Sequence, residues 1–186
     1  NTIFYFKTMR KLLADKMYNS SGEIINGQVV VLDDDGFVLS IEHVEKHDKT
    51  SVEFYDGLMI PGLINTHCHL ELSHMKGVVS TGTGLISFIT DVVSKRNMDP
   101  DYIQQCIQEA DREMYENGIV AVGDISNASD TFSVKESSSM LYCNFVEFFD
   151  FLQDQDAAKT FVQYKQVYDL FKSSKKQLTS CVPHAP

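Results

Sequence analysis

The sequence predicts an α/β fold: a parallel sheet with helices outside it, preceded by a small β-rich unit. After residue 58 the expected elements follow in the order β-α-β-loop-β-α-β, which is typical of parallel strands joined by crossover connections. Residues 1–57 instead contain turn signals between short runs of β-branched residues. We therefore divide the chain into a first domain over residues 1–57 and an α/β domain over residues 58–186.

A hairpin organises the first domain. Residues 29–32 and 37–41 are rich in β-branched and apolar residues, and the segment 33–36, Asp-Asp-Asp-Gly, supplies a turn between them. His43 and His47 follow among charged residues, so we interpret both as surface histidines. The unit as a whole is expected to be a scaffold.

The second domain opens with a strand expected over residues 58–66. It shows almost no polar alternation before Asn65, which favours a strand buried on both faces, as in a parallel sheet. A loop over residues 70–77 is expected to leave its end, and a Thr/Gly-rich stretch follows at 80–84.

Apolar spacing and capping signals predict the remaining elements. Asp99 is expected to cap a helix that starts at Pro100 and ends before Asn117-Gly118. The expected set comprises helices over 85–95, 100–116 and 156–175, strands over 119–124, 141–149 and 178–182, and a Ser-rich loop over 126–139.

Two histidines end the first strand of the second domain. His67 and His69 are separated by one residue, so on a strand their side chains point to the same face and Cys68 points to the other. Two imidazoles placed in this way can bind one metal ion, and imidazole suits zinc, iron or nickel. A structural pair is the alternative, because His-x-His also arises by chance.

Other polar residues fall near the same strand ends, where parallel sheets carry their chemistry. Glu71 would share the parity of the histidine pair if the strand continued, and could bind substrate or water; a solvated loop residue is the alternative. The same two alternatives apply to His74, which lies further from the histidine pair in the sequence. Asp124 could orient a ligand, although we favour a structural role, and Glu147 is a carboxylate on an otherwise apolar strand that could face a pocket. His184 follows the last expected strand.

The composition excludes several classes of partner. A net charge of −10 and a pI near 4.9 argue against nucleic acid. The longest apolar runs are too short to span a bilayer. The four cysteines are widely spaced and form no C-x-x-C motif, so we expect reduced thiols in a cytoplasmic protein. The expected partner is a small molecule, and a homodimer is compatible with the sequence.

Two motifs resemble those of a known family. The run PGLINTHCHLELSH, residues 61–74, resembles the signature of the amidohydrolase superfamily, and PHAP at 183–186 is similar to the Pro-His-x-Pro of its aminohydrolase branch. That branch includes guanine deaminases, triazine hydrolases and methylthioadenosine/S-adenosylhomocysteine deaminases. The resemblance implies a small β-sandwich followed by a (β/α)₈ TIM-type barrel. Such a barrel needs about 250 residues, so we expect residues 58–186 to be its first four β/α units and the chain to be incomplete.

The same resemblance implies roles for three residues. His67 and His69 would be ligands of one divalent metal, zinc by preference, with iron or manganese as alternatives. His184 would contact the substrate and polarise the ring position under attack. The branch has two further ligands, a His and an Asp, and a catalytic Glu, which would all lie beyond Pro186.

The predicted function is hydrolytic deamination of a purine-like or other nitrogen heterocycle. A zinc-type metal lowers the pKa of bound water to roughly 7, so that metal-bound hydroxide can attack the carbon that bears the amino group. Two alternatives stay open. In the first, an enzyme of the same fold hydrolyses a different bond, as in a cyclic amidohydrolase of the imidazolonepropionase type or a chlorohydrolase. The other is a non-catalytic module whose histidine pair is structural or vacant.

Overall fold

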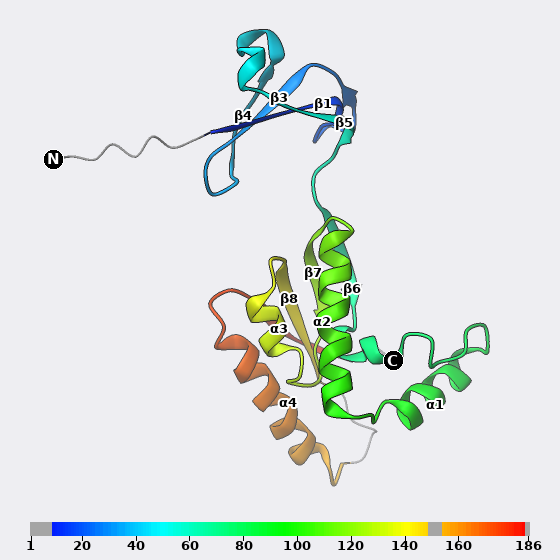
Figure 1. The fold of residues 1–186 in the computed structure, drawn as a ribbon. Helices are drawn as coiled ribbons and strands as arrows, with labels where there is room; N and C mark the ends of the chain where they lie inside the picture. Colours follow the sequence, from blue (N-terminus) through cyan, green and yellow to red (C-terminus); the bar gives the residue numbers. More distant parts are fainter. Residues whose placement is uncertain (1–8, 149–153, 185–186) are drawn as a thin grey trace, which may run out of the picture. The chain divides into compact units, whose positions relative to one another are not determined.

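The computed structural model describes residues 9–148 and 154–184 (Figure 1), and the chain separates into two compact units, Asn1–Pro61 and Gly62–Pro186. Phe149, the last residue of one expected strand, and the last two residues of the PHAP motif lie outside the described residues.

The first unit is built on a five-stranded sheet. Four strands lie in the order β2-β1-β3-β4, and β5 pairs in parallel with β1. The hairpin predicted over residues 29–41 is confirmed, because β3 and β4 pair antiparallel around the expected turn. The strands are β1 Arg10–Tyr18, β2 Ile24–Ile25, β3 Gln28–Leu32, β4 Val38–His43 and β5 Glu53–Met59, with 3₁₀ turns η1 Val44–Lys46 and η2 Lys49–Ser51.

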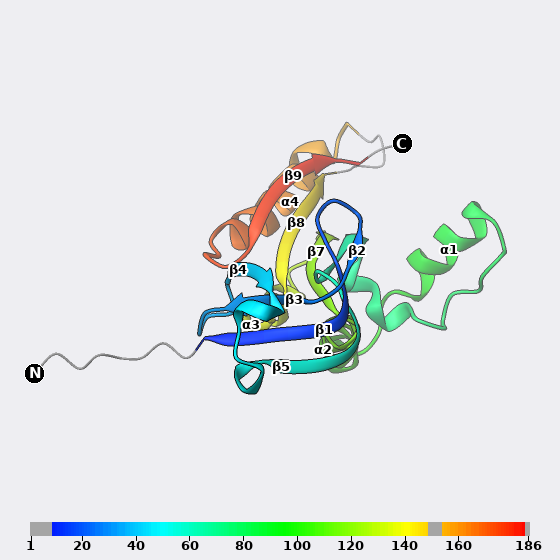
Figure 2. The ribbon, with the colours of Figure 1, turned by 90° about the horizontal axis from the view of Figure 1, so that it is seen from above.

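The second unit contains a four-stranded sheet in which every strand pair is parallel. Its order is β6-β7-β8-β9, so each strand lies beside its predecessor in the chain (Figure 2). The strands are β6 Leu63–Cys68, β7 Ile119–Ile125, β8 Leu141–Phe148 and β9 Leu178–Pro183. The prediction of a parallel sheet is therefore confirmed, and the carboxyl ends of its four strands meet at one edge.

The strand expected over residues 58–66 is wrong in two respects. Residues 58 and 59 belong to β5, and β6 begins only at Leu63. Pro61 lies between the two strands and interrupts the pairing, because a proline has no N–H to donate to a sheet. Burial on both faces is also wrong: Ile64 is 64% exposed. Among the described strands β6 pairs only with β7, so one of its edges and much of its surface remain open.

The helices α1 Leu85–Lys95, α2 Pro100–Glu116, α3 Phe132–Ser137 and α4 Ala157–Lys172 belong to this unit. Asp99 caps α2 as predicted, since its side chain accepts the N–H groups of Asp101 and Tyr102. α3 lies inside the stretch expected to be a Ser-rich loop, so that prediction is wrong. The burial of Val134 in the core explains the helix better than the local propensity of its serines does.

A hydrophobic core joins the sheet to α2 and α3. It consists of Leu70, Ile107, Val122, Val134, Met140 and Tyr142. α1 makes no such contact: none of its residues is buried, and it lies apart from the sheet in both views (Figures 1 and 2). Its apolar side chains include Ile86 and Phe88, which are 77% and 49% exposed. Among the described residues, no helix combines the length and the apolar character that crossing a bilayer requires.

Candidate metal and substrate site

The end of β6 carries the histidine pair. Between Asn65 and Cys68 the register against β7 shifts, so that three residue steps of β6 match two of β7, as in a β-bulge. Cys68 pairs with Asp124 and packs against the core, and burial raises the pKa of its thiol to about 12. His67 and His69 lie on the other side, with ring centroids 5.1 Å apart and ring planes at 70°. The two rings therefore lie side by side.

The histidine pair suits a metal chemically. Burial, followed by the neighbouring His67, lowers the pKa of His69, which favours the neutral imidazole that binds metals. Two nitrogen donors from one strand are compatible with zinc, which takes four ligands in all. Within residues 9–148 and 154–184, no group of three or more His, Cys, Asp or Glu side chains could hold a metal ion. Among the described residues, the histidine pair is therefore not joined by a third such side chain.

Glu71 does not continue the strand. Residues 70–75 form a 3₁₀ helix, η3 Leu70–Met75, in place of the expected loop, so the parity shared with the histidine pair is lost. Glu71 is 5% exposed, which rules out a solvated loop residue. Its Oε2 accepts the backbone N–H groups of Asn127 at 2.8 Å and Ala128 at 2.9 Å. Burial raises the pKa of Glu71 to about 7, and these two hydrogen bonds oppose the rise. Glu71 therefore ties η3 to the segment after β7.

His74 is also buried, and its contact is with the backbone. Its Nε2 lies 2.8 Å from the carbonyl oxygen of Arg96, the residue that follows α1. A carbonyl oxygen only accepts, so this nitrogen carries the proton. The contact links η3 to the end of α1, which is a structural role.

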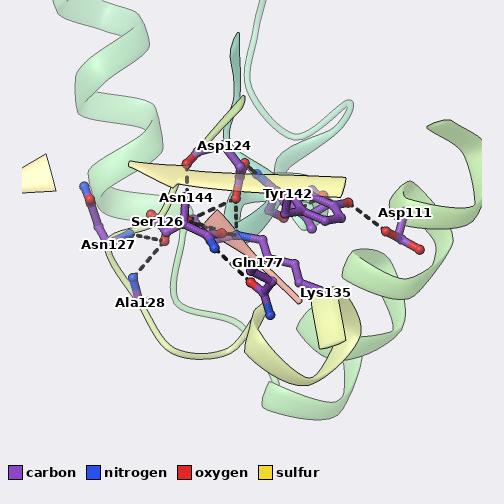
Figure 3. A network of polar contacts seen from close by, with 12 residues as sticks. Asp111, Asp124, Ser126, Asn127, Ala128, Lys135, Tyr142, Asn144 and Gln177 are labelled. Atoms are coloured by element: carbon purple, nitrogen blue, oxygen red, sulfur yellow. Dashed lines mark hydrogen bonds and ion pairs between the residues drawn. The ribbon is translucent and has the colours of Figure 1, made fainter. Parts of the chain in front are cut away.

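Asp124 lies in a buried polar network (Figure 3). Its Oδ1 accepts the N–H of Leu70, the residue after His69, at 2.8 Å. Its Oδ2 accepts from Nζ of Lys135 at 2.5 Å, and both side chains are 0% exposed. Lys135 also donates to Ser126 Oγ at 2.9 Å and to Asn144 Oδ1 at 2.8 Å. These contacts give Asp124 a structural function: it fixes the backbone where β6 passes into η3.

Aromatic rings surround the buried ammonium group. Nζ of Lys135 lies 5.3 Å from the ring centroid of Tyr142 and 4.8 Å from that of Phe171. The Tyr142 hydroxyl donates to Asp111 Oδ1 at 2.7 Å, and burial, followed by this hydrogen bond, raises the pKa of Tyr142 (Figure 3). The cation is thus satisfied by three oxygen acceptors and two rings. Nothing in the sequence pattern predicts that this ammonium group is buried, since Lys135 is an isolated lysine in a segment rich in serine.

The ends of β8 and β9 bring Glu147 and His184 together. Nδ1 of His184 lies 2.8 Å from Oε1 of Glu147. Asn127, which follows β7, donates from Nδ2 to Oε2 of Glu147 at 3.3 Å and accepts the backbone N–H of Glu147 at 3.2 Å. The carboxylate on the apolar strand therefore has partners, which sequence reasoning missed. Asn127 carried no signal beyond its position after a strand.

The fold and the histidine pair together define an α/β protein with polar residues gathered at the carboxyl ends of parallel strands, the usual place for a hydrolase site in such folds. The amidohydrolase family model matches residues 58–159, and the chain belongs to this family.

Individual relatives agree with this assignment. The chain is 26% identical to an adenosine deaminase of Helicobacter pylori over 174 residues, which cover 88% of this chain and 42% of that protein. It superimposes on the crystal structure of aminofutalosine deaminase from H. pylori in complex with methylthio-coformycin, with a TM-score of 0.79, 21% identity and coverage of 95% of this chain and 44% of the other. A zinc-bound adenosine deaminase from Xanthomonas campestris gives a TM-score of 0.70 at 15% identity, with coverage of 95% and 43%. The chain thus spans less than half the length of each.

Proposed function

We propose that this chain is the first part of a metal-dependent hydrolytic deaminase that acts on a purine-like or other nitrogen heterocycle. In this proposal residues 1–57 form a small β-sandwich domain and residues 58–186 form the first four β/α units of a barrel. The observation that carries it is the pair of imidazoles of His67 and His69, 5.1 Å apart at the carboxyl end of β6. The rest of the barrel, with the remaining ligands, would follow in the longer protein.

His67 and His69 would hold the metal through their ring nitrogens. A bound divalent ion, zinc by preference and iron or manganese as alternatives, would lower the pKa of water and so supply a nucleophile at neutral pH.

His184 would act on the substrate. A hydrogen bond between its ring and the heterocycle would orient the substrate, so that the carbon that bears the amino group is the one attacked. Water then adds at that carbon, the C–N bond breaks, and ammonia leaves after a proton transfer to the departing nitrogen. Glu71 would keep its structural contacts with the backbone of Asn127 and Ala128 and would border the site from η3.

The relatives support this class of substrate. One is named an adenosine deaminase, and the superimposed aminofutalosine deaminase binds methylthio-coformycin. Zinc is present in the adenosine deaminase of X. campestris. These names favour an aromatic nitrogen ring that carries an exocyclic amino group, and they favour zinc as the metal.

The test is ammonia release by the full-length protein, loaded with zinc, from a panel of aminopurines and their nucleosides. His67→Ala and His69→Ala should each lose zinc in metal analysis and lose turnover. The matched control is His43→Ala, since His43 is an exposed histidine of the first unit and its loss should change neither quantity. Unchanged turnover in His67→Ala would refute the proposal.

Two other outcomes would identify the alternatives. Hydrolysis of a cyclic amide or release of chloride, with no ammonia from any aminoheterocycle, would indicate a cyclic amidohydrolase or a chlorohydrolase. A full-length protein that binds no transition metal would indicate a non-catalytic module.

A further inference from the structure

We propose that Glu147 and Asn127 are positioning residues for His184, and that they determine which ring nitrogen of His184 meets the substrate. The inference deepens the proposed function and rests on it, because it takes His184 to be the residue that contacts the heterocycle.

The contact between Glu147 and His184 fixes the proton on one nitrogen. Oε1 of Glu147 lies 2.8 Å from Nδ1 of His184, and the Glu147 side chain is only 15% exposed. An ionised carboxylate only accepts hydrogen bonds, so Nδ1 must be the donor. Since Nδ1 is engaged in this way, any contact with a substrate is made through Nε2. In general, a hydrogen bond at one imidazole nitrogen determines which of the two nitrogens carries the proton.

The backbone of His184 is held by the same strand. Its N–H donates to the carbonyl oxygen of Phe148 at 3.1 Å, and Phe148 directly follows Glu147 in β8. The ring and the backbone of His184 are therefore both anchored to consecutive residues of β8. This arrangement limits the directions in which Nε2 can point.

Asn127 in turn holds the carboxylate. Its Nδ2 donates to Oε2 of Glu147 at 3.3 Å, and its Oδ1 accepts the backbone N–H of Glu147 at 3.2 Å. Both ends of one amide are thus used on one residue, which leaves the amide a single sensible orientation. With Oε2 held by Asn127, Oε1 stays directed at His184.

The backbone of Asn127 connects this group to the histidine pair. Its N–H donates at 2.8 Å to Glu71, which lies two residues after His69. A continuous series of contacts therefore runs from the segment after the proposed metal ligands, through Glu71, Asn127 and Glu147, to His184. It links the carboxyl ends of β6, β7, β8 and β9, so the two sides of the proposed site are positioned by the same residues.

The test measures the tautomer of His184 in the full-length, zinc-loaded protein labelled with ¹⁵N-histidine. Long-range ¹H–¹⁵N spectra distinguish a ring protonated at Nδ1 from one protonated at Nε2, and His184→Gln identifies the resonances. We expect Nδ1–H in the natural protein. Glu147→Gln can present either an oxygen or an N–H group to the ring, so the two tautomers should mix. Glu147→Leu removes this carboxylate and should weaken the preference further.

Asn127→Ala removes the amide and should give an intermediate loss of the preference, because Glu147 keeps its charge but gains freedom to rotate. The matched control is Glu113→Leu, since Glu113 is a surface carboxylate paired with Lys76 at 2.9 Å. This variant should leave the His184 spectrum unchanged. An unchanged Nδ1–H tautomer in both Glu147→Gln and Glu147→Leu would overturn the inference.

Measurements of kcat distinguish a failure of this inference from a failure of the proposed function. With an aminoheterocycle that the natural protein deaminates, Glu147→Gln should lower kcat by about tenfold or more, as is typical when a group that orients a reactive histidine is lost, while Glu113→Leu keeps the natural rate. A changed tautomer with an unchanged kcat would overturn the link to the substrate. If the natural protein deaminates nothing while the tautomer depends on Glu147, the proposed function fails and the positioning contact stands.

Discussion

Replacing Lys135 by methionine should destabilise the protein strongly. Methionine keeps most of the volume of the side chain but removes the ammonium group, and Asp124 is then left 0% exposed without its counterion. Leaving one partner of a buried pair uncompensated costs about 3–5 kcal/mol. Ser126 and Asn144 also lose a hydrogen-bond donor. Because a protein is typically stable by about 5–15 kcal/mol, the loss is a large part of the total.

The measurement is thermal and urea unfolding of the full-length protein in parallel with Lys76→Met. Lys76 forms an exposed pair with Glu113 at 2.9 Å, and such pairs contribute about 0–1 kcal/mol, so this control should unfold almost as the natural protein does. Adding Asp124→Asn to Lys135→Met should recover part of the lost stability, since it removes the uncompensated charge while keeping an acceptor for the N–H of Leu70. The reasoning is refuted if Lys135→Met lies within about 1 kcal/mol of its control, or if the double variant is less stable than the single one.

Three further variants test other parts of the second unit by urea unfolding. Gly123→Ala should cost about 1–3 kcal/mol, because an added Cβ would lie 2.9 Å from the carbonyl oxygen of Thr66 in the adjacent strand; a neutral result would show that β6 can move away from β7. Glu71→Leu should cost about 1–3 kcal/mol for each of the two backbone N–H groups left without their acceptor, and an equal effect of Glu71→Gln would argue against the role of the charge. Asp99→Ala should cost about 1 kcal/mol through the lost cap of α2, while Asp99→Asn should cost much less.

The sequence predicts the elements whose determinants are local. Asp99 and Pro100 mark the start of α2 within the chain itself. The succession of strands and helices after residue 58 predicts that the strands are parallel, as they are in the structure. The side-by-side placement of His67 and His69 follows from the two-residue repeat of a strand, and the structure shows the two rings together. These inferences need no knowledge of distant segments.

The predictions that fail depend on contacts far along the chain. The repeat that would have aligned Glu71 with the histidine pair ends with β6 at Cys68. The carboxylate of Glu71 instead accepts two backbone N–H groups that lie 56 and 57 residues later in the chain. α3 forms where serines would favour a loop, because tertiary packing of Val134 outweighs local propensity.

Lys135 shows why such residues escape sequence reasoning and why they matter at this site. Its charge would ordinarily place it at the surface, yet its Nζ is enclosed by Asp124, Ser126 and Asn144, which the chain brings together only when β7 and β8 pair. The ion pair gains little net stability over an apolar pair of the same size. What it provides is a defined position for Asp124, and through Asp124 a defined position for the N–H of Leu70, one residue after His69. The precision of the histidine pair therefore depends on a lysine that the pattern of the sequence gives no reason to select.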